Sequence, residues 1–245
     1  MIGILYVFHG SQKNEKNQAA KVFIQQLQQR LDSTWIQATA FLENHSDTIV
    51  NMSRKMIDQG VTQLVVVPVL LFAAKHALVD IPAELELVKI ENPQIKIRQT
   101  ETFGSKVGSR TVLLERFQKI AKENPDEQLI GFLVAHGTKK TDEPQQILVD
   151  IATGIQEQVH FPIFATSLKG NENYLETINQ QLQKDQTAVI VPFFLFEGHL
   201  ITIMKDTLKD RFSTQNFIIT RTLEFDPIIL ADLEKIVIEG VQCIQ

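Results

Sequence analysis

The sequence is poor in cysteine, with one residue, Cys243, among 245. A lone thiol cannot form an intramolecular disulfide, which fits a reducing compartment, so we expect a cytoplasmic protein. No apolar run reaches the roughly 18 residues that a membrane-spanning helix needs, and we expect no membrane partner. The formal net charge is −5 and no basic stripe stands out, which argues against a nucleic-acid partner.

Several catalytic signatures are missing as well. The chain has no G-x-x-x-x-G-K-[ST] phosphate loop and no G-x-G-x-x-G dinucleotide fingerprint. The segment FGSKVG (103–108) does not have the spacing of a G-x-S-x-G nucleophile elbow. Without a second cysteine there is no C-x-x-C pair. These absences argue against P-loop hydrolysis, acyl transfer by an elbow serine and iron–sulfur binding.

Short apolar runs alternate with longer amphipathic segments along the chain. Strands are predicted at residues 3–8, 35–41, 64–69, 95–100, 129–135, 161–166, 188–194 and 217–222. Amphipathic helices are predicted at residues 14–31, 46–60, 107–124 and 226–241. This alternation indicates an α/β architecture with parallel sheets that helices cover on both faces.

The chain also repeats its own pattern. A strand followed by His-Gly occurs as YVFHGS (6–11) and again as LVAHGT (133–138). The strand LVVVP (64–68) matches AVIVP (188–192). Because several matches recur in the same order, we infer an internal duplication of one α/β unit.

The polar segment KENPDEQ (122–128) is the only polar break that also falls near the middle of the chain. Domain boundaries fall in such exposed polar linkers. The predicted domains are therefore residues 1–124 and residues 125–245.

Histidines of the first half follow predicted strands. His9 directly follows the first strand, and His76 follows the third strand after a short connector. The carboxyl ends of parallel strands meet at one edge of a sheet, where ligands bind, so we expect both imidazoles at that edge. Gly10 lets the chain turn sharply beside His9. Two converging histidines indicate metal binding or proton transfer.

Acidic residues could join this edge or could cap helices. Glu43 follows the second strand and could bind a metal or accept protons, but it also lies near a helix start, where negative charge is favoured. For His45 and Asp47 we favour the helix-start interpretation. Asp80 lies four residues after His76, so in a helix it could orient the imidazole. We slightly favour a capping role for Asp80.

Three motifs resemble the class II chelatases, which comprise the sirohydrochlorin ferrochelatases and the anaerobic sirohydrochlorin cobaltochelatases. They are HGS at 9–11, FLE at 41–43 and P-x-x-L-x-x-x-x-H-x-x-x-D-I-P from Pro68 to Pro82, of which the last is the most specific. Long members of the family carry two such domains in tandem, so the resemblance spans the chain. It implies two flavodoxin-like domains that face a central tetrapyrrole cleft.

The activity implied by the resemblance is insertion of Fe²⁺ into sirohydrochlorin to make sirohaem. The resemblance assigns His9 and His76 as metal ligands and catalytic residues, with Glu43 as their acid/base partner. Weaker candidates for contacts with the substrate are Gly10, Ser11, His136 and His199. We expect no cofactor beyond the divalent metal substrate, and activity should fall below about pH 6 as imidazole protonates.

The second half departs from the family pattern. The position that corresponds to Glu43 falls near Ser167, so the carboxylate is missing. The spacing from Val-Pro to histidine is one residue shorter at His199 than at His76, and Asp-Ile-Pro does not follow. We therefore expect the main site in the first half.

Other interpretations remain open. Co²⁺ or Ni²⁺ would suit the same donors, which leaves a cobaltochelatase as an alternative. A carrier of tetrapyrrole or metal would use the same crevice without turnover. An unrelated two-domain α/β enzyme with histidine as its acid/base is a third possibility. We expect a monomer, because the duplication replaces the dimer of the short family members.

Overall fold

The computed structural model describes residues 1–245 and contains two parallel four-stranded sheets. The strands of the first sheet, in the order β2-β1-β3-β4, are β1 (Ile2–Phe8), β2 (Ile36–Phe41), β3 (Gln63–Pro68) and β4 (Lys96–Gln99). Those of the second, in the order β6-β5-β7-β8, are β5 (Leu129–Ala135), β6 (Ile163–Ser167), β7 (Thr187–Pro192) and β8 (Asn216–Ile219). The predicted α/β class, parallel pairing and duplication are confirmed.

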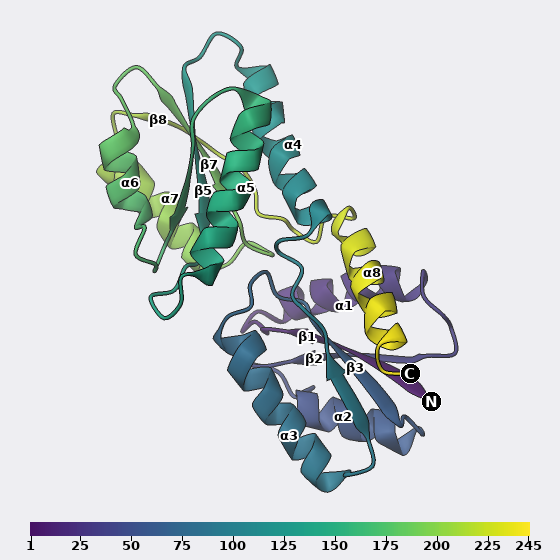
Figure 1. The fold of residues 1–245 in the computed structure, drawn as a ribbon. Coiled ribbons are helices and arrows are strands. Elements are labelled where there is room, and N and C mark those ends of the chain that lie inside the picture. Colours follow the sequence, from purple (N-terminus) through teal and green to yellow (C-terminus); the bar gives the residue numbers. More distant parts are fainter. The chain divides into compact units, whose positions relative to one another are not determined.

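Helices connect the strands in both halves (Figure 1). In the first half they are α1 (Asn14–Gln28), α2 (Ile49–Asp58), the short π-helix η1 (His76–Asp80) and α3 (Ile81–Glu91). The remaining helices are α4 (Val107–Glu123), α5 (Glu143–Val159), α6 (Tyr174–Gln181), α7 (His199–Arg211) and α8 (Ile229–Gln242). No helix is both long and apolar enough to cross a membrane.

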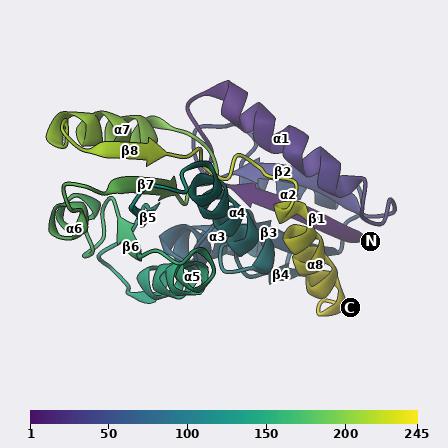
Figure 2. The ribbon, with the colours of Figure 1, turned by 90° about the horizontal axis from the view of Figure 1, so that it is seen from above.

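The first sheet is covered on both faces. Every residue of β1 after Ile2 is buried, as expected for a central strand whose side chains alternate between two helical layers. Helices α2 and α3 pack against one face, and α1 and α8 lie side by side on the other (Figure 1, Figure 2). Gly240 of α8 lies against Val65 of β3, where a larger residue would collide.

The second sheet has the same layered plan. Helices α6 and α7 cover one face, where Ile178, Ile201 and Met204 pack with Phe132 of β5. On the opposite face, the ring of Phe117 in α4 lies 6.1 Å from that of Phe161, just before β6. Apolar burial of this kind supplies most of the stability of helices that would be marginal alone.

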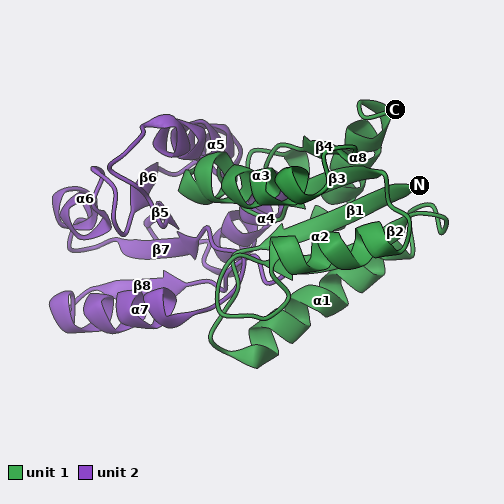
Figure 3. Ribbon diagram, turned by 90° about the horizontal axis from the view of Figure 1, so that it is seen from below, with its two compact units in different colours: residues 1–108, 227–245 green, residues 109–226 purple.

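The compact units do not follow the predicted boundary. One unit comprises residues 1–108 and 227–245, and the other comprises residues 109–226 (Figure 3). Helix α4 therefore belongs with the second sheet, although it follows β4, and α8 returns to the first. Pattern alone shows that a helix is amphipathic, but it does not show which sheet its apolar stripe covers.

Two helix starts also differ from expectation. Thr48, rather than an earlier Ser or Asp, caps α2 by accepting a hydrogen bond from the backbone N–H of Asn51. Helix α8 begins at Ile229, so the Asp-Pro pair at 226–227 lies in the preceding turn. Gly60 follows the end of α2 with a φ of +96°, the left-handed conformation in which glycine commonly ends a helix.

Candidate metal centre

The candidate site begins at the carboxyl ends of β1 and β2. These strands pair in parallel, with Phe8 opposite Phe41. The pairing continues beyond both strands, since the N–H of Leu42 donates to the carbonyl of Phe8 (3.0 Å) and that of Glu43 donates to the carbonyl of His9 (2.9 Å). These bonds hold the backbone of Glu43 beside that of His9. Strand register therefore brings both residues to the same edge.

His9, Glu43 and His76 bring three potential metal ligands together. One ligand atom from each residue lies within 4.8 Å of the others. The rings of His9 and His76 have centroids 4.5 Å apart and are inclined by 38°. The first two side chains are exposed and the third is partly buried. Imidazole nitrogen with carboxylate oxygen suits divalent iron, cobalt or nickel, and three protein ligands leave coordination positions open.

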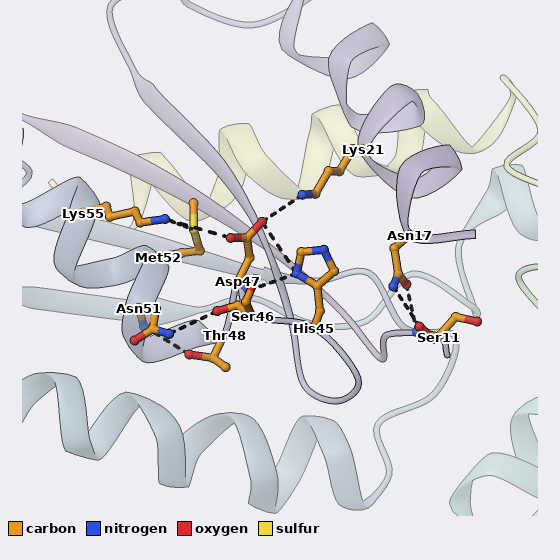
Figure 4. Close-up of polar contacts among 10 residues, drawn as sticks. All are labelled: Ser11, Asn17, Lys21, His45, Ser46, Asp47, Thr48, Asn51, Met52 and Lys55. Atoms are coloured by element: carbon orange, nitrogen blue, oxygen red, sulfur yellow. Dashed lines mark hydrogen bonds and ion pairs between the residues drawn. The ribbon is translucent and has the colours of Figure 1, made fainter. Parts of the chain in front are cut away.

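Gly10 lets the chain turn directly after His9. Its φ is +91°, a conformation that residues with a side chain rarely adopt. A Cβ atom at this position would overlap the backbone carbonyl of Glu43. The following residue, Ser11, is clamped by the buried Asn17, which bonds both its N–H and its carbonyl at 2.8 Å (Figure 4). The loop that presents His9 is thus fixed at two successive residues.

The third potential ligand, His76, lies at the start of a π turn. The N–H of Ile81 donates to the carbonyl of His76, five residues earlier. Because Ile81 is already engaged and Pro82 has no N–H, the carbonyl of Ala77 lacks a donor within the helix. It accepts instead from Nε2 of Gln99, at 2.7 Å. With Ile81 and Ala77 buried, the turn is anchored both to the core and to the end of β4.

Asp80 contacts both His76 and Lys75. Nδ1 of His76 lies 2.7 Å from one carboxylate oxygen, and Lys75 Nζ lies 2.8 and 3.0 Å from the two oxygens. The hydrogen bond from Lys75, and then that from His76, hold the pKa of Asp80 below its ordinary value despite some desolvation. The Asp80 side chain makes no capping bond to α3. The favoured capping role is therefore wrong, and the imidazole contact is formed.

Asp47 and His45 belong to a separate polar network (Figure 4). The Asp47 carboxylate lies 2.8 Å from Lys21 Nζ and 4.0 Å from Lys55 Nζ. The hydrogen bond from Lys21 is the largest cause that lowers the pKa of Asp47. His45 accepts the Asp47 N–H at Nδ1 (2.9 Å), and its ring packs 4.5 Å from that of Phe41. These contacts order the loop between β2 and α2.

In the second half, Lys169 takes the place of Glu43. Its N–H donates to the carbonyl of His136 at 2.9 Å, as the N–H of Glu43 donates to that of His9. The equivalent position was expected near Ser167, which is buried and lies two residues earlier. An ammonium group has no lone pair for a metal ion and repels cations. The missing carboxylate is thus replaced by a positive charge.

His199 also differs from His76 in its support. It is the first residue of α7, which is a regular α-helix without a π turn. Four residues later stands Ile203, where the first half has Asp80. The neighbouring Glu197 forms an ion pair of 2.8 Å with Lys205. Nothing equivalent to the carboxylate on Nδ1 of His76 supports this imidazole.

The site residues predicted from the sequence fall into two groups in the structure. The structure brings His9, Glu43 and His76 together, with Gly10 and Ser11 in the adjoining loop. His136 and His199 lie at the strand ends of the other unit, as exposed side chains. Sequence reasoning missed three residues that support the site, which are Asn17, Lys75 and Gln99. It also missed Lys169, which replaces the carboxylate in the second half. The motif H-x-x-x-D signalled only the contact between His76 and Asp80.

Comparison with known proteins gives consistent relatives. The sirohydrochlorin ferrochelatase of Priestia megaterium is 30% identical over 230 residues, which cover 92% of this chain and 85% of that protein. The sirohydrochlorin cobaltochelatase of the same organism is 26% identical over 214 residues, which cover 85% of this chain and 69% of that protein.

A solved structure described as SirB from Bacillus subtilis with Fe³⁺ has a TM-score of 0.87 and 27% identity, and the match covers 98% of this chain and 95% of that one. The model of the CbiX family matches residues 3–120 and again residues 131–239, once for each half of the duplication. Since these two matches together span most of the sequence, the chain belongs to the CbiX family.

Proposed function

We propose that this protein is a sirohydrochlorin chelatase that inserts Fe²⁺ into sirohydrochlorin to form sirohaem. The observation that carries the proposal is the cluster of His9, Glu43 and His76 at one sheet edge. The ferrochelatase relative, similar over 92% of this chain, supports the choice of substrate.

The donor set suits transfer of a metal ion rather than storage. His9 and His76 would hold the ion through imidazole nitrogens, and Glu43 would supply a carboxylate oxygen. Neutral imidazole and carboxylate bind Fe²⁺ or Co²⁺ without the strong retention that thiolates give. The exposure of His9 and Glu43 leaves the ion accessible to an incoming macrocycle.

Metal insertion also releases protons. As the divalent ion enters the macrocycle, two pyrrole N–H bonds break and two protons must be accepted. As a general base, Glu43 would take one of them, and a histidine nitrogen that has given up the metal would take the other. The closeness of Glu43 to both histidines supports this role. Water carries both away from this exposed edge.

Cobaltochelatase activity is the second candidate, because a cobaltochelatase relative matches 85% of this chain. The same three donors suit Co²⁺ and Ni²⁺. A cytoplasmic location and a monomeric state stay predictions, and sedimentation would test the second.

The test is anaerobic metallation of sirohydrochlorin with Fe²⁺ and Co²⁺ in parallel, followed by absorbance. We expect many turnovers per chain, with Fe²⁺ preferred. At most one turnover per chain would indicate a carrier, and faster Co²⁺ insertion would reassign the metal. If neither ion is inserted faster than in the uncatalysed reaction, the proposal is refuted.

A further inference from the structure

We propose that Asp80 is a positioning residue for His76, whose Nδ1 it holds so that Nε2 is the nitrogen presented to the metal ion. The inference rests on the proposed function only in taking His76 as a metal ligand. The contact that carries it is the 2.7 Å separation between His76 Nδ1 and Asp80 Oδ2.

The chemistry of this contact determines the tautomer. A carboxylate only accepts hydrogen bonds, so the nitrogen that faces it carries the proton. A neutral imidazole has one N–H, and with Nδ1–H directed at Asp80 the lone pair is on Nε2 of His76. Metal-binding histidines commonly donate their other N–H to a carboxylate, which fixes the ring and raises its basicity.

The local backbone holds this pair in place. The π turn puts Asp80 at its last residue and His76 at its first, and the N–H of Ile81 closes the turn on the carbonyl of His76. Ile81 is fully buried, so its side chain anchors the turn to the hydrophobic core. Gln99 bonds the carbonyl of Ala77, which the turn leaves without a helical partner. The turn is thus held independently of the His76–Asp80 contact.

Lys75 completes the arrangement from the other side. Its Nζ contacts both oxygens of Asp80, at 2.8 and 3.0 Å, so the carboxylate is bonded to the ammonium group of Lys75 as well as to the imidazole of His76. Lys75 is mostly exposed, at 59% of its side chain, and such an ion pair is weak on its own. Its contribution is to limit the rotamers of Asp80.

The second half of the chain provides an internal contrast. His199 follows the equivalent strand, but Ile203 stands at the position of Asp80 and α7 has no π turn. That half also carries Lys169 in place of Glu43. The carboxylate support therefore occurs where the three-ligand cluster occurs, and is missing where the cluster is broken.

The experiment measures Co²⁺ binding to the full chain in the Asp80→Ala and Asp80→Asn variants. Loss of an outer partner of a metal ligand weakens metal binding by about 10–100-fold, and we expect a Kd increase in that range for both variants. The His76→Ala variant sets the lower limit of affinity. The Glu91→Gln variant, which removes an ion pair with Arg54 at the end of the following helix α3, should bind as wild type.

A second readout separates positioning from a merely structural role. The ¹⁵N shifts of the His76 ring should report Nδ1–H in the wild type and in Lys75→Met, but a mixture of tautomers in Asp80→Ala. Circular dichroism should show all variants folded. Wild-type Co²⁺ affinity in both Asp80 variants, or an Nε2–H tautomer in the wild type, would overturn the inference.

These measurements need no tetrapyrrole. If the wild type fails to metallate sirohydrochlorin but the Asp80 variants lose Co²⁺, the proposed function fails and the positioning role stands. If the wild type metallates sirohydrochlorin and the Asp80 variants bind Co²⁺ normally, the proposed function stands and the positioning role fails.

Discussion

His9 and His76 each present an imidazole nitrogen to the cluster, and Glu43 adds a carboxylate oxygen. Structural zinc sites are closed by four protein ligands, whereas catalytic sites with three keep a position open for substrate. A site that must surrender its ion gains from few ligands and from solvent access. At the scale of single residues, the incomplete and exposed donor set therefore fits the proposed transfer of an ion.

Removing either imidazole should abolish most activity without unfolding the protein. We expect His9→Ala and His76→Ala each to weaken Co²⁺ binding at least ~100-fold, because loss of an outer partner alone costs about 10–100-fold. Neither side chain is fully buried, so the thermal unfolding midpoint should change little. Sirohydrochlorin metallation measures the loss of activity, and calorimetry measures both the Co²⁺ affinity and the unfolding midpoint. The control is His160→Asn, a change at an exposed histidine just after α5. Near wild-type metallation by both alanine variants would refute the assignment.

Asp47 should affect stability in a pH-dependent way. Its pKa is lowered in the folded state, chiefly by the Lys21 hydrogen bond, so its ionised form stabilises the fold above the ordinary carboxyl pKa. That stabilisation is lost as the pH falls through the folded pKa. We expect Asp47→Asn to reduce the free energy of unfolding by about 1 kcal/mol at pH 7, with the difference shrinking toward pH 3.

Urea unfolding at both pH values measures this effect. The control Glu157→Gln changes an exposed carboxylate on α5 and should leave the free energy of unfolding nearly unchanged. An Asp47→Asn penalty that stays constant between pH 7 and pH 3 would contradict the role of the charge.

The cluster residues were predictable because each follows a predicted strand of the first sheet, and parallel strands end at one edge. The equivalence of Lys169 with Glu43 could not be predicted, because it depends on a backbone hydrogen bond to His136 that the sequence does not show. The contact between Asp80 and His76 was visible as a spacing only. Choosing it over a helix cap required the side-chain geometry.

At the scale of elements, the loop after β1 is the most constrained part of the site. Gly10→Ala should cost at least ~1 kcal/mol of stability, because alanine is strained at a φ of +91°. The new Cβ would also overlap the carbonyl of Glu43, so that residue must move away from His9. We expect a clear loss of Co²⁺ affinity in addition to the loss of stability.

Gly60→Ala is the matched control for this change. Gly60 has a φ of +96°, and a Cβ there would meet nothing within 4 Å. It should therefore show the conformational cost, near 1 kcal/mol, with wild-type Co²⁺ affinity. Equal metal affinity in both variants would show that the Gly10 loop does not position the ligands.

The π turn shows why some elements escape prediction. Residues 76–91 carry no strong helical stripe, and the turn depends on what surrounds it. Pro82 has no N–H to donate within the segment, and this can be read from the sequence. The donor that compensates for it, Gln99, comes from β4 and cannot be found from the local sequence. A long-range side chain thus decides the local hydrogen-bond pattern. The central strands, buried on both faces, needed no such information.

At the scale of the whole molecule, the duplication is complete in fold but not in chemistry. Each half has a parallel sheet of the same strand order, and the family model matches each once. The final helices are exchanged between the units, with α4 in the second and α8 in the first. The predicted division at residue 124 assumed that each unit is continuous in sequence. Only tertiary packing shows that it is not.

This asymmetry predicts one strong metal site per chain. The second half has Lys169 in place of Glu43, and His199 lacks the carboxylate partner that His76 has. The double variant His136→Ala/His199→Ala should therefore bind one Co²⁺ with an affinity within about threefold of the wild type, whereas His9→Ala should lose that site. Isothermal titration gives the stoichiometry and the Kd together.

The single variant His199→Ala should likewise reduce metallation less than His76→Ala. Two equivalent strong sites in the wild type would contradict this asymmetry, because both halves would then bind the metal. A greater loss in the double variant than in His9→Ala would place the main site in the second half. The positive charge of Lys169 makes either result unfavourable, since the second half carries an ammonium group at the chain position where the first half carries a carboxylate.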